Sequence, residues 1–276
     1  MSTEATNLVS IILVNYNGSS FLYTCLDSIE KFVNHCNHEI IIVDNYSSDD
    51  SVRIIKDKFS SSRLICLQSN LGFGKANNLA VKHSRGQYLL FLNTDTILTE
   101  NTPKILSDYL QQNKNIGAIG SHITFKDGSY QLSYGKLPSL VVEFFYKIKY
   151  NSDSRWHQIF ARFYDRTYSR IKEVGWVTGA CMMMRCDIFE QVGGFDENFF
   201  MYFEDKDICK RVKELGYKVV YYPKTSIIHL LGGSSHGIKK SVNRYYRESQ
   251  LHYYQKHLGK FQTVILNLYL RLSGKV

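Results

Sequence analysis

Two hydrophobic patterns alternate along the first part of the chain. Short continuous apolar runs predict buried strands of a parallel sheet, and apolar residues spaced three and four apart predict helices between them. Strands are expected at 9–14, 40–43, 64–67 and 88–92, and helices at 19–33, 47–59, 74–83 and from 102 onward. This spacing leaves room for β-α units with right-handed crossovers, so the pattern predicts an α/β fold.

Hydroxyl residues mark the expected helix starts. Ser19 or Ser20 can cap the first helix, and Ser47 with Ser48 can start the second. Thr102, which stands directly before a proline, is the expected cap of the fourth helix.

The second part of the chain is less regular. An apolar stretch at 175–184 contains two glycines and Trp176. It is either a plain core strand or a strand whose glycines let a ring-shaped ligand approach, and the spacing leaves both open. Further strands are expected at 218–222 and 227–230, and a helix from Glu204 to a stop at Gly216.

Amides and carboxylates follow the ends of three expected strands. Asn15 and Asn17 come after the first strand, Asp44 after the second, and Asn93 with Asp95 after the fourth. Asn and Asp favour turns in general, which explains one such site better than three. Since ligands of open α/β sheets bind beyond the carboxyl ends of the strands, these residues indicate a nucleotide-type binding edge.

Three carboxylates open the expected helix that follows an aromatic run: Glu204, Asp205 and Asp207. Acidic residues suit the first turn of any helix, because they complement its dipole. They suggest more than a helix start because the chain also has an acidic site at Asp95 and a histidine at His229. A histidine in an apolar strand is more often a core residue than a ligand, and the pattern alone leaves both interpretations open.

The net charge of +9 is concentrated in two aromatic-rich segments. Residues 136–172 carry +5 and residues 237–276 carry +7, so the rest of the chain is net negative. Apolar stripes at 140–148 and 261–272 lie within these segments. They suit helices in the interface of an anionic membrane, helices packed on the core, or a surface for nucleic acid. Because no nucleic-acid motif is present, no nucleic-acid partner is expected.

Six cysteines form no C-x-x-C pair. Cys25, Cys66 and Cys209 occupy apolar-periodic positions and are interpreted as reduced core residues. The chain start has no basic region before its first apolar run, and no run approaches the roughly 20 apolar residues of a spanning helix. A cytoplasmic protein is expected, with peripheral contact at the inner face of the membrane. The oligomeric state stays open.

Seven stretches between Val9 and Ser234 resemble family 2 glycosyltransferases with the GT-A fold. They are VSIILVNYNG, EIIIVDNYSSDDS, NLGFGKANNLA, YLLFLNTDTIL, GWVTGACMMMR, GGFDENFFMYFEDKDICKRV and IIHLLGGSS. The resemblance implies a Rossmann-like, mostly parallel central sheet flanked by helices in domain 1–234. A nucleotide-binding half would cover about 1–120, an acceptor and catalytic half 121–234, and a basic amphipathic helical extension 235–276.

The resemblance also implies roles at the nucleotide. Asp44 would contact the nucleobase, and Asn17 with Asn78 would line the nucleotide pocket. Lys75 would lie near the phosphates.

A divalent metal, Mn²⁺ or Mg²⁺, is implied at Asp95 and His229. Asp95 matches the last acid of the family's D-x-D motif, but the first acid is Asn93 here. An amide is a poorer ligand for a hard cation than a carboxylate. The metal would therefore rest on Asp95, His229 and the diphosphate, and Asn93 is counted with the nucleotide-binding residues.

For the transfer itself, Asp205 matches the family's catalytic base, with Glu204 beside it. Trp176 and Gly179 would border the donor sugar. One base is enough for in-line displacement, which inverts the anomeric centre, and the metal would neutralise the leaving diphosphate.

Within the family, the sequence looks most like rhamnosyltransferases of bacterial O-antigen and other surface polysaccharides. The resemblance implies dTDP-rhamnose as donor, with a UDP-sugar as the alternative, and a lipid-linked saccharide acceptor. A nucleotidyltransferase is a rival, but 15–18 is not the glycine-rich basic loop of those enzymes. A non-catalytic basic membrane or nucleic-acid adaptor is a second rival, against which stands the joint presence of Asp44, Asp95, Asp205 and His229.

Overall fold

The computed structural model describes residues 7–144, 168–230 and 239–273. The strands are β1 Val9–Asn15, β2 His38–Asp44, β3 Arg63–Cys66, β4 Tyr88–Leu92, β5 Thr96–Leu98, β6 Ile116–Thr124, β7 Tyr134–Gly135, β8 Lys172–Glu173, β9 Trp176–Val177, β10 Cys181–Arg185 and β11 Lys218–His229. The helices are α1 Ser19–Phe32, α2 Ser51–Lys58, α3 Phe73–Lys82, α4 Thr102–Gln112, α7 Cys186–Gln191, α8 Glu204–Glu214, α9 Lys239–His257 and α10 Gly259–Leu272.

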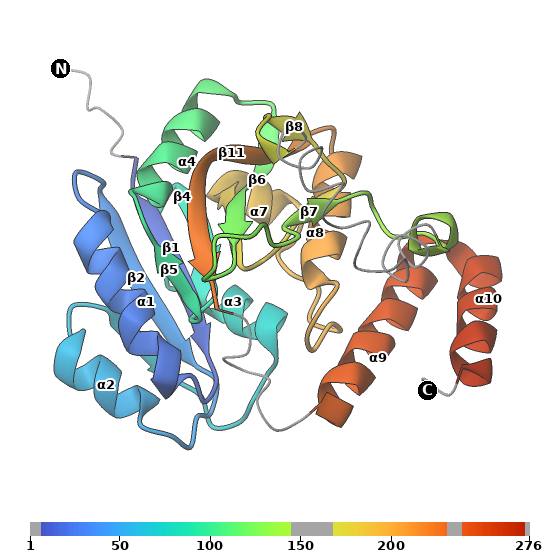
Figure 1. Cartoon of the computed structure of the whole chain (residues 1–276), viewed down its shortest axis with the longest axis horizontal. Helices are drawn as coiled ribbons and strands as arrows, with labels where there is room; N and C mark the ends of the chain where they lie inside the picture. The colour runs from blue at the N-terminus through green and yellow to red at the C-terminus, as the bar shows by residue number, and fades with distance from the viewer. Residues whose placement is uncertain (1–6, 145–167, 231–238, 274–276) are drawn as a thin grey trace.

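One central sheet organises the part of the chain that the structure describes. Its strands lie in the order β3-β2-β1-β4-β10-β6-β11-β5, and β8 pairs with β11. The first four strands are parallel, as are β6 and β11, while β10 and β5 run antiparallel to their neighbours. Helices cover both faces (Figure 1). The predicted α/β fold with a mostly parallel sheet is confirmed.

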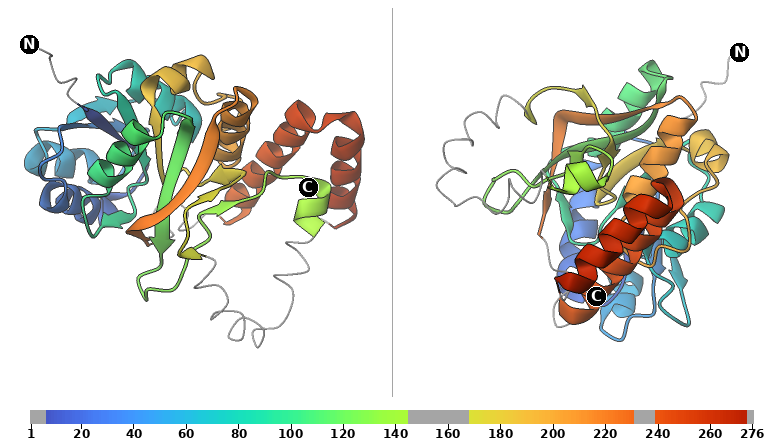
Figure 2. Two further views of the ribbon diagram at one scale, coloured as in Figure 1. Left: turned by 90° about the horizontal axis from the view of Figure 1, so that it is seen from above. Right: turned by 90° about the vertical axis from the view of Figure 1, so that its right-hand side faces the viewer.

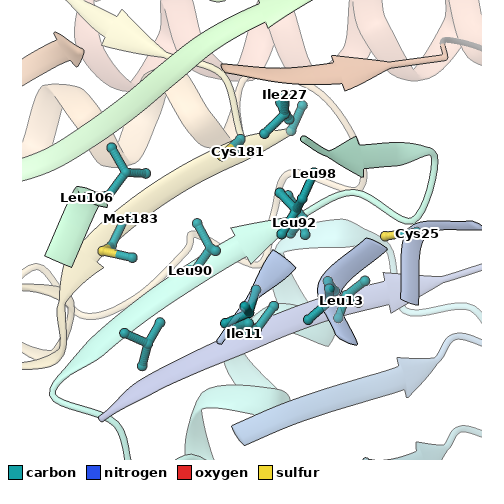
Figure 3. Close-up of a cluster of buried hydrophobic side chains, with 14 of the residues drawn as sticks. Ile11, Leu13, Cys25, Leu90, Leu92, Leu98, Leu106, Cys181, Met183 and Ile227 are labelled. Atoms are coloured by element: carbon teal, nitrogen blue, oxygen red, sulfur yellow. The ribbon is translucent and has the colours of Figure 1, made fainter. Parts of the chain in front are cut away.

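The central strands are buried on both faces, which explains their unbroken apolar runs. On one face, Ile11, Leu13, Leu90, Leu92 and Met183 belong to one hydrophobic cluster (Figure 3). The second cluster lies on the other face, below α3, α7 and α8, and contains alternate residues of the same strands. The β1–β2 register places Asn15 directly beside Asp44, so the polar strand ends meet at one edge.

The predicted helix starts are partly wrong. Gly18 occupies the N-cap position of α1, and no side-chain cap is present. The second helix begins at Ser51 rather than at Ser47, because Asp44 and Asn17 bind the backbone N–H groups of residues 47 and 48 and hold them in a loop. The cap of α4 is the side chain of Asn101, which accepts from a backbone N–H group at 3.3 Å.

Two expected strands also differ from the structure. The stretch 175–184 divides into β9 and β10, because the chain turns at 178–180. The runs 218–222 and 227–230 form one long strand, β11, with a register shift between Tyr222 and Ser226. Pro223 lies in that interval, where a missing N–H donor is tolerated.

All six cysteines are free, as predicted, but their burial differs. Cys25 and Cys209 are buried in the core, whereas Cys66 is exposed. Cys66 ends β3, the edge strand of the sheet, where one flank has no neighbouring strand in the described residues. The prediction of a core position for Cys66 is therefore wrong.

The C-terminal helices α9 and α10 form a hairpin at the opposite end of the molecule from β1, β2 and their helices (Figures 1 and 2). Their buried residues form a third hydrophobic cluster with the loop before α8: Phe199, Phe203, Tyr253, Tyr254, Leu266 and Leu270. The helical extension is present and packs on the rest of the chain. The predicted boundary at 234 falls outside the described residues, as does the part of the 140–148 stripe beyond 144.

Candidate functional site

The ends of β1 and β2 hold a hydrogen-bonded group of polar side chains. Asn15 Nδ2 donates to Asp44 Oδ1 at 2.9 Å, and Asp44 Oδ2 accepts from the backbone N–H of Ser47 at 3.0 Å. Asn17 adopts a positive φ of 50°, and its Oδ1 accepts from the backbone N–H of Ser48 at 2.8 Å. The structure therefore brings the two predicted nucleotide residues Asp44 and Asn17 to one edge of the sheet.

The first turns of α3 carry two more predicted nucleotide residues. Lys75 pairs with Glu197 at 3.5 Å, and both side chains are about half exposed. Asn78 is engaged by the backbone of Phe195: its Oδ1 accepts at 2.9 Å and its Nδ2 donates at 2.8 Å. The amide of Asn78 therefore ties α3 to the loop before α8, a positioning role that its sequence position did not indicate.

Asp95 and His229 lie in direct contact, although 134 residues separate them. The pairing of Thr96 with His229 between β5 and β11 brings them together. His229 Nε2 lies 3.0 Å from Asp95 Oδ1 and 3.5 Å from Asn93 Nδ2. Both Asp95 and His229 are buried. The predicted metal-binding pair thus forms one cluster with the half-buried Asn93.

The chemistry of this cluster fits a divalent metal. No group of three or more His, Cys, Asp or Glu side chains able to hold a metal occurs in residues 7–144, 168–230 and 239–273. The Asp95–His229 pair alone offers one carboxylate and one imidazole. His229 Nδ1 is buried without a hydrogen-bond partner among the described residues. A carboxylate and an imidazole suit Mn²⁺, and diphosphate oxygens would have to complete the coordination.

An unusual turn positions the carboxylates at the start of α8. Tyr202 and Phe203 both adopt positive φ angles, 68° and 66°. Such angles are uncommon for bulky residues and cost about 1–3 kcal/mol each, so the surroundings must hold them. Phe203 is buried and its ring contacts Tyr246 and Tyr253 of α9. The C-terminal hairpin therefore supports the turn that precedes Glu204.

Glu204 and Asp205 have contrasting environments. Glu204 is buried, and its Oε2 has no hydrogen-bond partner in the described residues. Burial, followed by the negative charge of Asp205, raises the pKa of Glu204 to about 8. Asp205 Oδ1 instead accepts from the backbone N–H of Lys206 at 2.8 Å and lies 3.5 Å from its Nζ. The raised pKa favours the protonated form of Glu204, whereas Asp205 has an adjacent cation, Lys206.

Lys206 connects Asp205 to the predicted sugar site. Its Nζ lies 4.6 Å from the ring centres of both Trp176 and Phe203. Burial lowers the pKa of Lys206, but the charges of Asp205, Tyr246 and Glu204, together with the hydrogen bond to Asp205, outweigh it, so the pKa is raised. Trp176 is buried, and its Nε1 donates to Lys136 O at 3.0 Å. Sequence reasoning assigned no role to Lys206; its place between two carboxylates was the available signal.

The turn at 178–180 lies between the Asn93–Asp95 loop and Asp205 at the start of α8. Asn93 donates its backbone N–H to Ala180 O at 3.1 Å. A Cβ on Gly179 would lie 3.3 Å from the ring of Phe73, at the start of α3, and 3.9 Å from Asp205 Cβ. Gly179 therefore stands where α3, the Asn93 loop and Asp205 converge. The separate roles at nucleotide, sugar and metal stay predictions.

The model of glycosyl transferase family 2 matches residues 10–193, which include β1 through β10 and more than half of the chain. The chain belongs to glycosyl transferase family 2. A second model, glycosyl transferase family group 2, matches residues 132–269, which include α8 and most of the C-terminal hairpin. Asp95 and the pair Glu204 and Asp205 of this family 2 transferase therefore all lie in sequence that one of the two models matches.

Two curated bacterial relatives match most of this family 2 transferase. The N-acetylglucosaminyl-diphospho-decaprenol L-rhamnosyltransferase of Mycobacterium tuberculosis is 26% identical over 81% of this chain and 76% of its own length. The rhamnosyltransferase WbbL of Escherichia coli K12 is 26% identical over 89% of this chain and 92% of its own length. The predicted resemblance to rhamnosyltransferases is confirmed.

Solved structures share the fold at low identity. GalNAc-T7 with UDP, GalNAc and Mn²⁺ aligns with a TM-score of 0.63 at 14% identity, over 90% of this chain and 48% of the other. This chain thus spans about half the length of that protein. The mannosyltransferase PcManGT of Pyrobaculum calidifontis, in complex with GDP-Man and Mn²⁺, aligns with a TM-score of 0.61 at 16% identity, over 96% and 70% of the two chains. The GT-A fold of this family 2 transferase is confirmed.

Proposed function

We propose that this family 2 transferase is an inverting hexosyltransferase that moves a sugar from a nucleoside diphosphate donor to a hydroxyl of a lipid-linked saccharide. L-Rhamnose from dTDP-rhamnose is the favoured donor, because two relatives over most of the chain are named rhamnosyltransferases. The observation that carries the proposal is the placement of Asp205, with its Lys206 partner, beside the Gly179 turn that also contacts the Asn93–Asp95 loop.

Asp205 acts as the general base. An acceptor hydroxyl is too weakly acidic to attack unaided, and a positioned carboxylate that takes its proton contributes roughly 10²–10⁴ in rate. The neutral form of Glu204 keeps a second negative charge away from Asp205. Lys206 holds Asp205 by a charged contact at 3.5 Å. One base on one side of the sugar is what a single inverting displacement requires.

Asp95 and His229 would hold a divalent metal, which supplies charge neutralisation for the leaving diphosphate when bound. The chain's own residues complete the phosphate site. Lys75 lies in the first turn of α3, and the N-terminal end of a helix favours anions. Asp44 and Asn17 occupy the adjoining edge of the sheet, where the nucleobase would lie.

The outer face of α10 supports peripheral contact with an anionic membrane, at the inner face of the cell membrane. Phe261, Val264, Leu268 and Leu272 recur every three or four residues and are 58% to 81% exposed. Lys260 and Arg271 flank this stripe. An apolar helix face with basic flanks suits the interfacial region of a bilayer. Among the helices that the structure describes, none has the length and hydropathy to cross a membrane.

The test is a panel of dTDP-, UDP- and GDP-sugars, measured for hydrolysis and for transfer with Mn²⁺ present. We expect dTDP-rhamnose to give the highest turnover, and Asp205→Asn to abolish transfer while donor affinity stays nearly unchanged. Asp127→Asn is the matched control, since it makes the same change in an exposed turn. Full activity of Asp205→Asn would remove Asp205 from the role of base, and preference for a UDP-sugar would select the alternative donor.

A further inference from the structure

A large pocket lies between the segment 132–144 and the C-terminal hairpin. Its volume is about 780 Å³, within the range of small-molecule sites. Leu140 and Val141 line one side, and Ile265 and Leu266 of α10 line another. Two elements more than 100 residues apart therefore build one mostly apolar pocket.

One end of this pocket reaches Lys206, the partner of the proposed base. Trp176 and Lys206 both line it. Lys206 Nζ lies 3.5 Å from Asp205 Oδ1, so a ligand that touches Lys206 is adjacent to the proposed base. The pocket thus lies next to Asp205, where an acceptor hydroxyl would have to approach the proposed base.

Charged side chains give the lining a net positive charge. Lys136 and Arg247 contribute two cations, against the single carboxylate of Glu143, and the third cation of the lining, Lys206, is paired with Asp205. Glu143 already accepts from Gln250 Nε2 at 2.6 Å. An apolar pocket with surplus cations complements a ligand that has an apolar tail and an anionic head.

The outer end of the pocket is apolar and open to solvent. Val141 and Phe144 are 64% and 62% exposed, and Ile265 and Tyr269 of α10 are more than a third exposed. The backbone N–H of Leu140 donates to the side chain of Gln262, at 3.5 Å, so this segment lies against α10. The opening is therefore continuous with the apolar face of α10 that we assign to the membrane.

We propose that this pocket binds the isoprenoid diphosphate part of the lipid-linked acceptor. The apolar walls hold the first isoprene units, Arg247 and Lys136 contact the diphosphate, and the attached saccharide extends past Lys206 to Asp205. The α10 face leads the rest of the lipid to the bilayer. The choice of ligand rests on the proposed function, whereas the location of the pocket does not.

The probe is geranylgeranyl diphosphate, titrated into the full chain without donor or metal. Trp176 lines the pocket and reports binding by fluorescence, once Trp156→Phe removes the other tryptophan. We expect saturable binding that is at least tenfold tighter than that of geranylgeraniol, inorganic diphosphate or a short-chain phosphatidylglycerol. Val141→Gln and Ile265→Gln should each weaken it roughly tenfold. Arg247→Gln should weaken binding of the diphosphate but not of the alcohol.

Leu215→Gln is the matched control, because Leu215 is an exposed apolar residue, 48% exposed, that lies outside both the pocket lining and the α10 face. We expect it to leave the affinity unchanged. Equal weakening by Leu215→Gln, equal affinity for phosphatidylglycerol, or no saturable binding would overturn the proposal. The proposal would also be wrong if light scattering showed a dimer that has to dissociate before the probe can bind. Because the assay contains no donor, a failed sugar transfer would count against the proposed function alone.

Discussion

Replacement of Glu204 by glutamine tests the assigned charges at the turn before α8. Glu204 is buried, its Oε2 has no hydrogen-bond partner in the described residues, and its pKa is raised from 4.5 to about 8. The folded state therefore keeps a proton that the unfolded state releases above about pH 4.5. Stability from this group is complete below pH 4.5 and is lost as the pH rises toward 8.

The magnitude follows from linkage. Each pH unit inside this window removes at most about 1.4 kcal/mol of the free energy of unfolding. Between pH 5 and pH 8 the loss is at most about 4 kcal/mol in the wild type. Glutamine has nearly the same shape as protonated glutamate and does not titrate. The stability of Glu204→Gln relative to the wild type should therefore increase steadily with pH.

The assay is urea unfolding of both proteins at pH 5, 6, 7 and 8. Titrating groups far from Glu204 change equally in both proteins, so their difference reports Glu204 together with the neighbours whose charges act on it, Asp205 and Lys206. Glu214→Gln, at the exposed end of the same helix, is the control for the measurement. A constant difference between Glu204→Gln and the wild type at all four pH values would refute the reasoning. At pH 7 the variant should also retain sugar transfer, because Asp205 is intact.

Three further predictions concern other parts of the molecule. Asp95→Ala or His229→Ala should each weaken binding of a nucleoside diphosphate at least tenfold when Mn²⁺ is present, but not when it is absent; calorimetric titrations unchanged with Mn²⁺ would contradict this. Asp207→Asn should destabilise the fold by about 3–5 kcal/mol, because it leaves buried donors without their carboxylate, and should lower Tm in calorimetry. We expect Tm to fall by about 6 °C or more; a Tm within about 1–2 °C of the wild-type value would show that these contacts contribute little to stability. The double change Leu268→Ser with Leu272→Ser should reduce co-sedimentation with phosphatidylglycerol vesicles and leave activity on a water-soluble acceptor unchanged; equal pelleting would favour helices that serve packing alone.

The sheet was predictable because its central strands are buried on both faces. Burial of that kind leaves a local signal, a continuous apolar run, which β1 and β4 both carry. The helix starts were less predictable, since they depend on distant side chains. Ser47 and Ser48 were expected to begin a helix, but Asn17, some 30 residues away, binds the backbone there.

The candidate site was predictable only in part. No hydrophobic period in the sequence relates Asp95 to His229, and only the family resemblance predicted that they act together. In the structure, the pairing of β5 with β11 brings them into contact. Lys206 was overlooked, because its importance depends on the rings of Trp176 and Phe203 around it. The pocket has no local signal at all, since its walls come from segments that meet only in the folded chain.

The contacts of Asp207 have a consequence for protein engineering. Its carboxylate is fully buried, pairs with Arg211 on its own helix, and accepts from Lys256 and His257 at 2.7 Å each. Asp207 lies two positions after the proposed base, so the hairpin stabilises the helix on which that residue lies. A chimera that takes its terminal hairpin from a homologous transferase would also need the acid that pairs with that hairpin, the counterpart of Asp207. A catalytic core shortened before α9 should be a poor starting point for either crystallisation or directed evolution.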